Sequence, residues 1–205
     1  MAEGELPPQL VTWLVLAALP LLLAACTAFT KISIVLAALR TGLGAEALLP
    51  FGSMLALGLV LTSLAMAPIG EALWLGFEDA GGTAGLANAS LAGWLELLEP
   101  LRGFLSEHAD PDDLELFAEL AGRSIDHPVA LVPAFLIGEL GRGLELAVMI
   151  LLPFVVVDLL AAQVLALVGL SQTPTSVLAL PAKILLFLAA SGWQTVVVGL
   201  IESYR

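Results

Sequence analysis

The amino-acid sequence predicts an all-α membrane protein with four long hydrophobic helical segments and an acidic helical insert outside the cytoplasm. Of its 205 residues, 60% are hydrophobic and 13% are charged, whereas a soluble domain has about 45–50% apolar and about 25% charged residues. The formal net charge of −12 is concentrated between Glu71 and Asp126, where twelve acids stand against Arg102 and Arg123. Such a segment would be repelled by nucleic acid and by an anionic lipid surface.

Four apolar segments are long enough to form spanning helices, which need about 20 mostly apolar residues. They cover residues 10–29, with an apolar run that continues to Arg40, and residues 48–69, 144–170 and 177–201. Pro153 predicts a kink in the third segment, and Pro181 lies near the start of the fourth, where proline is tolerated. The chain therefore divides into an N-terminal region (1–69), the insert (70–131) and a C-terminal helical hairpin (132–205).

The insert is predicted to contain short amphipathic helices. Two stretches, LAGWLELLEPLRGFLSEH and PDDLELFAELAGRS, place apolar residues at helical spacing with acids between them. Asp110 before Pro111 predicts a helix N-cap, and Gly122 predicts the end of the same helix.

The positions of lysine and arginine predict the orientation in the membrane. The connection between the first two segments carries Lys31 and Arg40, and that between the last two carries Lys183. Because cytoplasmic loops are rich in these residues, we expect the short connections to face the cytoplasm and the acidic insert to face outward.

Five charged residues in or beside the last two apolar segments require partners: Glu139, Arg142, Glu145, Asp158 and Lys183. The first three follow one another at i, i+3 spacing and would line one stripe of a helix, either as a self-satisfied ion cluster or as a contact with another protein or a lumen. Asp158 has no base nearby in the sequence, so Lys183 is its candidate partner. The two residues are not level in the predicted hairpin, so a pair between subunits is at least as well supported as a pair within the chain. Snorkelling to the interface is the alternative for Lys183.

Enzyme chemistry has little support in the sequence, and no catalytic, cofactor or metal site is expected. His108 and His127 are the only histidines and both lie in the insert, so Ser171 has no histidine base on any predicted span. The single cysteine, Cys26, excludes an intramolecular disulfide and a cysteine-based zinc site. It ends a lipoprotein-like LAAC stretch, but the N-terminus is acidic rather than basic, which favours an ordinary buried cysteine.

Three stretches, in this order, resemble the FliP/SctR (YscR) family of export-gate membrane proteins from flagellar and virulence type III secretion systems. They are FTKISIVLAALRTGLG, VPAFLIGELGRGLELAVMILLPFVVVDLL and ALPAKILLFLAASGWQ. The family motif is matched at Phe29, Thr30, Lys31, Arg40, Pro133, Phe135, Pro153, Phe154, Pro181, Gly192 and Trp193, together with Glu139, Asp158 and Lys183. The resemblance covers most of residues 27–195.

One departure from the family pattern concerns the loop after Gly169. There the family has a run of methionines that forms a flexible gasket around the closed pore, whereas this chain has Leu170, Ser171 and Gln172. Methionine is unbranched and deformable, so this constriction loop must close the pore differently or rely on a partner subunit. The family's usual lysine after Glu-Leu is Gly141 here, its aromatic before Lys183 is Ala182, and a common acid before Gly-Trp is Ser191. Together these departures suggest a divergent virulence-type or unclassified branch.

The resemblance implies a homopentamer in the bacterial inner membrane, within the secretion basal body. It would join small hairpin subunits (FliQ/SctS-like), a related larger subunit (FliR/SctT-like), and the switch and nonameric export subunits (FlhB/SctU-like and FlhA/SctV-like). Together they would form a helical gate for unfolded secreted proteins, in contact with membrane lipid and not with nucleic acid. The five charges would then lie at subunit contacts. The alternative is a small ion or solute transporter that uses Asp158, Glu145 and Lys183 as a relay.

Overall fold

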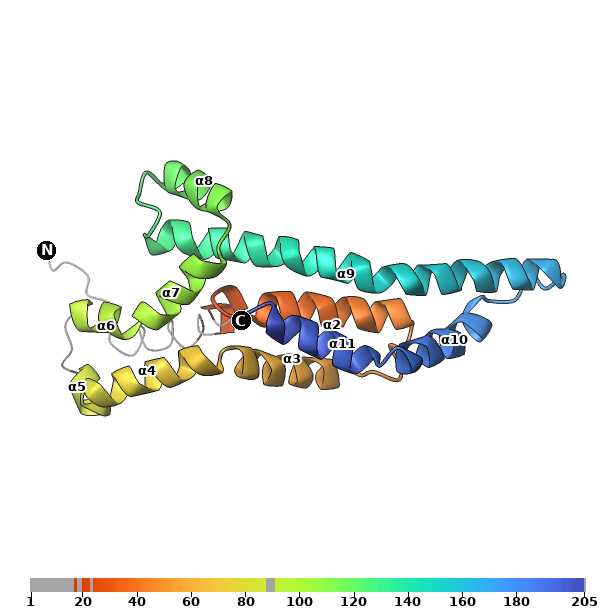
Figure 1. Cartoon of the computed structure of the whole chain (residues 1–205), viewed down its shortest axis with the longest axis horizontal. Coiled ribbons are helices and arrows are strands. Elements are labelled where there is room, and N and C mark those ends of the chain that lie inside the picture. Colours follow the sequence, from red (N-terminus) through yellow and green to blue (C-terminus); the bar gives the residue numbers. More distant parts are fainter. Residues whose placement is uncertain (1–16, 18–19, 23, 88–90, 205) are drawn as a thin grey trace, which may run out of the picture.

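The computed structural model describes residue 17 and residues 20–22, 24–87 and 91–204. In this part of the chain every regular element is a helix, so the predicted all-α class is confirmed for the described residues. The helices form an elongated bundle along one long helix, α9 (Pro128–Leu167), as Figure 1 shows. Half of the first predicted span, residues 10–29, lies outside the described residues.

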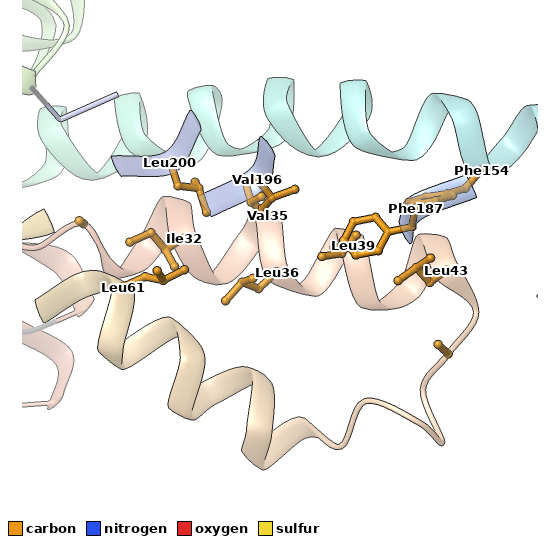
Figure 2. Close-up of a cluster of buried hydrophobic side chains, with 12 residues drawn as sticks. Ile32, Val35, Leu36, Leu39, Leu43, Leu61, Phe154, Phe187, Val196 and Leu200 are labelled. Carbon is orange, nitrogen blue, oxygen red and sulfur yellow. The ribbon is translucent and has the colours of Figure 1, made fainter. Parts of the chain in front are cut away.

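The helix α2 (Phe29–Leu43) forms the centre of the main core. Its buried stripe has the helical spacing i, i+3, i+4, i+7 and consists of Ile32, Val35, Leu36, Leu39 and Leu43. Side chains from four other helices pack against this stripe, as Figure 2 shows: Leu61, Phe154, Phe187, Val196 and Leu200. The helix ends at Gly44, whose φ of 66° is a left-handed conformation that glycine adopts without strain.

The long helix α9 has 40 residues, which corresponds to a length of about 60 Å. It begins within the predicted insert and not at residue 144, because His127 caps its first turn: the Val129 N–H donates to His127 Nδ1 at 3.2 Å. Pro133 and Pro153 both lie inside the helix, which continues through them to Leu167.

Small residues bring α9 close to α2. A Cβ atom on Gly42 would lie 2.7 Å from side-chain atoms of Leu151 and Phe154. A Cβ atom on Gly143 would lie 3.4 Å from the Cα atom of Lys31. The two helices therefore pack through glycine at both ends of their contact, as small residues allow in membrane helix pairs.

Two of the predicted spans are broken helices. In place of the predicted 48–69 segment, α3 (Phe51–Ala65) and α4 (Ala67–Asp79) meet at 64°. In place of the predicted 177–201 segment, α10 (Ser176–Ala189) and α11 (Gly192–Glu202) meet at 61°. Pro68 lies in the first turn of α4, where a missing N–H costs little.

The break between α10 and α11 has a strained backbone. Ser191 has a φ of 50°, a left-handed conformation that residues other than glycine rarely adopt. A Cβ atom on the following Gly192 would lie 2.2 Å from the ring of Phe187. The close approach of this ring therefore requires glycine at the start of α11.

The insert contains α5 (Gly82–Ala87), α6 (Leu91–Leu97), α7 (Glu99–His108) and α8 (Pro111–Ala121). The predicted caps of α8 are confirmed: Asp110 accepts a hydrogen bond from the Asp112 N–H at 2.9 Å, and Gly122 has a φ of 61°. Helices α7 and α8 pack on the N-terminal part of α9, where a second core includes Phe104, Leu105, Ala134 and Phe135.

Among the described residues, α9 alone is long and apolar enough to cross a membrane, and each bent pair adds one candidate span if its two helices are counted together. The described part therefore contains one clear candidate span, and at most three by length and composition, whereas the sequence predicts four. Only 11% of the most apolar 18-residue window of α9 is buried within this chain. Most of this apolar surface must therefore face lipid or other protein.

Candidate functional site

The larger group of buried charges lies between α2 and α9. Glu139 is 0% exposed and Lys31 is 1% exposed. Lys31 Nζ lies 3.5 Å from Glu139 Oε1, and Arg142 Nη2 lies 2.9 Å from the same oxygen. A buried charge is tolerated only when it is paired. These residues, together with Tyr204, form what we call the buried ion cluster.

Tyr204 follows α11 and satisfies the second oxygen of Glu139. Its hydroxyl donates to Glu139 Oε2 and also lies 3.4 Å from the Ala28 carbonyl oxygen. The ring centroid lies 3.6 Å from Lys31 Nζ, in cation–π contact. Burial, followed by the negative charge of Glu139, raises the pKa of Tyr204, so the phenol keeps the proton that it donates. The cluster therefore fixes the C-terminal end of the chain to α2 and α9.

Arg142 connects the buried ion cluster to the insert. Its Nη2 also donates to the carbonyl oxygen of His108, at the end of α7. The side chain is nevertheless 41% exposed, and its Nε has no hydrogen-bond partner in the described part of the chain. Two cations, Lys31 and Arg142, share one carboxylate, so the cluster carries a net charge of +1.

The second group is the ion pair of Asp158 on α9 and Lys183 on α10, whose Oδ2 and Nζ atoms are 2.7 Å apart. The structure thus forms this ion pair within one chain, between the two helices of the hairpin. Asp158 and Lys183 lie closer to the same depth than the sequence predicts, because α9 ends at Leu167 and not at residue 170. Asp158 lies nine residues before that end and Lys183 seven residues after the start of α10, a difference of about 3 Å that a lysine side chain can span.

Glu145 does not join either group. Although it shares a helical stripe with Glu139 and Arg142 in the sequence, its side chain is exposed, and no described residue forms an ion pair with it. Two of the three predicted stripe charges are therefore brought together, and the third is left on the surface of α9.

The predicted constriction loop lies at the tip of the α9–α10 hairpin, at the opposite end of the molecule from α5 and α6, as Figure 1 shows. Gly169 has a φ of 76°, and the Leu170 N–H donates to the Leu165 carbonyl at 2.8 Å, which closes the helix end. Leu170, Ser171 and Gln172 are all exposed. The loop is therefore accessible at one end of the molecule.

Most of the remaining motif residues support the fold. Phe135 is 0% exposed and Phe154 is 3% exposed, and Trp193 meets the Phe187 ring edge-on at 5.3 Å. Thr30 Oγ1 donates to the Ala24 carbonyl at 2.6 Å. Within the motif, Phe29 and Thr30 begin α2, Pro133 and Pro153 lie in α9, Pro181 lies in α10, and Gly192 begins α11.

The structure corrects the use of Lys31 and Arg40 as loop charges in the orientation argument. Lys31 is buried in α2. Arg40 Nε donates to the Leu49 carbonyl at 2.7 Å, and its Nη2 to the Glu46 carbonyl at 3.2 Å. Both cations therefore have structural partners, and the charge bias for orientation is weaker than the sequence indicates.

Sequence reasoning did not identify two contacts of the buried ion cluster, Lys31 with Glu139 and Tyr204 with Glu139. A signal for the first was present, because a lysine and a glutamate in separate apolar segments both need a buried partner. Tyr204 carried no such signal, since a tyrosine near the end of a chain is common at an exposed position.

Comparison with known proteins agrees with the resemblance. The model of the FliP family matches residues 10–200. The probable translocation protein y4yL of Sinorhizobium fredii is 34% identical, covering 98% of this chain and 96% of the relative. The flagellar biosynthetic protein FliP of Caulobacter vibrioides is 33% identical, covering 93% and 73%. The hypersensitivity response secretion protein HrcR of Ralstonia nicotianae is 30% identical, covering 100% of both chains.

Proposed function

Because the chain belongs to the FliP family, and so is a component of a type III secretion or flagellar export apparatus, we propose that it forms the channel of the export gate. Five copies would assemble in the bacterial inner membrane as multi-pass subunits, with FliQ/SctS-like hairpin subunits and a FliR/SctT-like subunit. Unfolded secreted proteins would cross through the assembly. The chain would act as a structural subunit and not as an enzyme, with energy supplied by other parts of the apparatus.

The observation that carries this proposal is the extent of the exposed apolar surface. On α9 large apolar side chains are exposed from Leu144 to Leu167, a distance of about 35 Å along the helix. A second set is exposed on α3 and α4, from Phe51 to Leu75. Figure 1 shows α4 and the α9–α10 connection at opposite ends of the molecule.

A bilayer has a hydrocarbon core of about 30 Å. The α9 surface alone exceeds this thickness, and the surface of α3 and α4 extends the apolar region toward the other end of the molecule. A single flat bilayer therefore cannot cover both surfaces at once. Contact with further protein subunits would cover the remainder, as an assembled gate requires.

The arrangement of the charges argues against the transporter alternative. Asp158 and Lys183 are paired with each other at 2.7 Å. Glu145 precedes Asp158 on the same helix by 13 residues, which places it about 20 Å away along the axis. A proton or ion relay needs groups within hydrogen-bond reach, and these three side chains do not form one.

Photo-crosslinking to a stalled substrate tests the channel role. A photoreactive amino acid replaces Ser171 in the constriction loop, and the apparatus is loaded with a secreted protein fused to a domain that folds too stably to pass. We expect light-dependent adducts between this position and the stalled protein. The control position is Ser63, an exposed residue on α3. The proposal is contradicted if neither position forms adducts with the stalled protein, or if both positions form them in equal amounts.

A further inference from the structure

One carboxylate, that of Glu139, joins three regions of the chain. Its Oε1 accepts hydrogen bonds from Lys31 of α2 and from Arg142, and its Oε2 accepts one from the Tyr204 hydroxyl, just after α11. The side chain is 0% exposed, so bulk water does not replace a partner that leaves. The hydrogen bonds of such a buried network strengthen one another, and the loss of one weakens the others.

The insert reaches this carboxylate through Arg142. The Nη2 atom that donates to Glu139 also donates to the His108 carbonyl, at the end of α7, where helix carbonyls carry a partial negative charge. Gly138 leaves room for this contact. A Cβ atom there would lie 3.4 Å from Arg142 Nη2 and 3.7 Å from the Asp110 N atom, in the turn between α7 and α8. The insert therefore docks on α9 at a notch beside the buried ion cluster.

Tyr204 lies against the insert as well as against Glu139. Its ring centroid is 5.5 Å from that of His108 and 6.0 Å from that of Phe104, both on α7. Figure 1 shows the C-terminal end of the chain near α7 and beside the start of α2. A displacement of α7 would therefore act on Tyr204 directly, in addition to its effect through the cluster.

We propose that these contacts form a latch that couples the docking of the insert to the docking of α11. When the insert leaves α9, Arg142 loses the His108 carbonyl and Tyr204 loses its aromatic neighbours. Both residues then hold Glu139 less firmly, and the end of α11 is released from α2 and α9. Because α11 follows α10, which in turn follows the predicted constriction loop, a partner that moves the insert would alter the helices behind that loop. The latch lies within one chain and does not depend on the proposed assembly.

Hydrogen exchange of the detergent-solubilised chain, followed by mass spectrometry, tests the latch, because it measures the opening of each segment separately. The variant G138V fills the notch without changing a residue of the buried ion cluster. We expect exchange to accelerate in α7 and α8, and by at least about fivefold at the end of α11, from Val197 to Tyr204. The matched control is G141V on the same helix, where a Cβ atom would meet no described atom within 4 Å. It should leave both segments unchanged.

A second variant approaches the latch from the other end and does not depend on the folding of G138V. Coupling between two sites is reciprocal, so Y204F, which removes the hydrogen bond to Glu139 from the α11 side, should accelerate exchange in α7 and α8 as well as in α11. The adjacent substitution S203A should not.

Two results would overturn the latch. In the first, G138V opens α7 and α8 while α11 keeps the protection of the unmodified chain, and Y204F opens α11 alone. In the second, exchange rises equally in every helix, α3 included, which indicates general destabilisation. Because the experiment uses a single chain, the latch can hold when the chain does not form an assembly of five copies, and it can fail when that assembly forms.

Discussion

Removal of one hydroxyl group, in the variant Y204F, tests the role of the buried ion cluster. Tyr204 donates its hydroxyl hydrogen to Glu139, whose side chain is 0% exposed. Phenylalanine keeps the ring in contact with Lys31 Nζ, at 3.6 Å from the centroid, so the variant isolates the hydrogen bond. A hydrogen bond to a charged group contributes about 1.5–3 kcal/mol. For a chain of this length each kcal/mol corresponds to about 2–4 °C, so the midpoint of unfolding should fall by about 3–12 °C.

The assay is thermal unfolding of the detergent-solubilised protein, followed by circular dichroism. The matched control is S203A, which removes a hydroxyl from the adjacent, exposed residue, where it donates to the Leu200 carbonyl at 2.8 Å. A surface substitution of this kind changes the free energy of unfolding by less than about 0.5 kcal/mol. If Y204F unfolds at the same temperature as S203A and the unmodified protein, Tyr204 does not stabilise Glu139 as the structure indicates.

Two further predictions use the same assay. D158A should lower the free energy of unfolding by about 3–5 kcal/mol, because it leaves the charge of Lys183, whose side chain is 8% exposed, without a partner. K183M should cost less, since methionine fills the space and Asp158 is half exposed; a larger loss for K183M than for D158A would refute this reasoning. At the α10–α11 break, S191G should raise the free energy of unfolding by about 1 kcal/mol by relieving the left-handed serine. G192A should lower it by about 1–3 kcal/mol, because its Cβ atom would meet the Phe187 ring at 2.2 Å; equal midpoints for both variants would contradict the proposed strain.

Local signals in the sequence were sufficient to predict the helical class and the ends of α8. The cap at Asp110 and the stop at Gly122 depend on side-chain and backbone preferences within a few residues, which the sequence displays directly. The apolar composition likewise located the regions of α3, α9 and α10.

Features that depend on tertiary packing were not predicted. The break at Ser191 occurs where Phe187 closely approaches Gly192, two residues in different helices. The early start of α9 depends on the cap formed by His127, a residue that the sequence analysis assigned to the insert. A hydropathy pattern shows only how long and how apolar a segment is. The approach of Phe187 to Gly192 and the cap formed by His127 therefore leave no trace in it.

The candidate site was predicted in part. Asp158 and Lys183 were identified as a possible pair, but their relative depth depended on the end of α9, which the apolar pattern placed three residues too late. The burial of Lys31 was missed because a lysine between two apolar runs was interpreted as part of a short connection, although a lysine in an apolar region also needs a buried partner. The subunit contacts predicted for Glu139 and the other charges remain predictions.

The mass of the detergent-solubilised assembly tests the central claim most directly, measured first with the chain alone and then after co-expression with the small hairpin subunits. We expect an assembly of five copies, about five times 21.3 kDa for the protein component, which gains mass when the hairpin subunits are present. A stable monomer or dimer that recruits no hairpin subunit would contradict it.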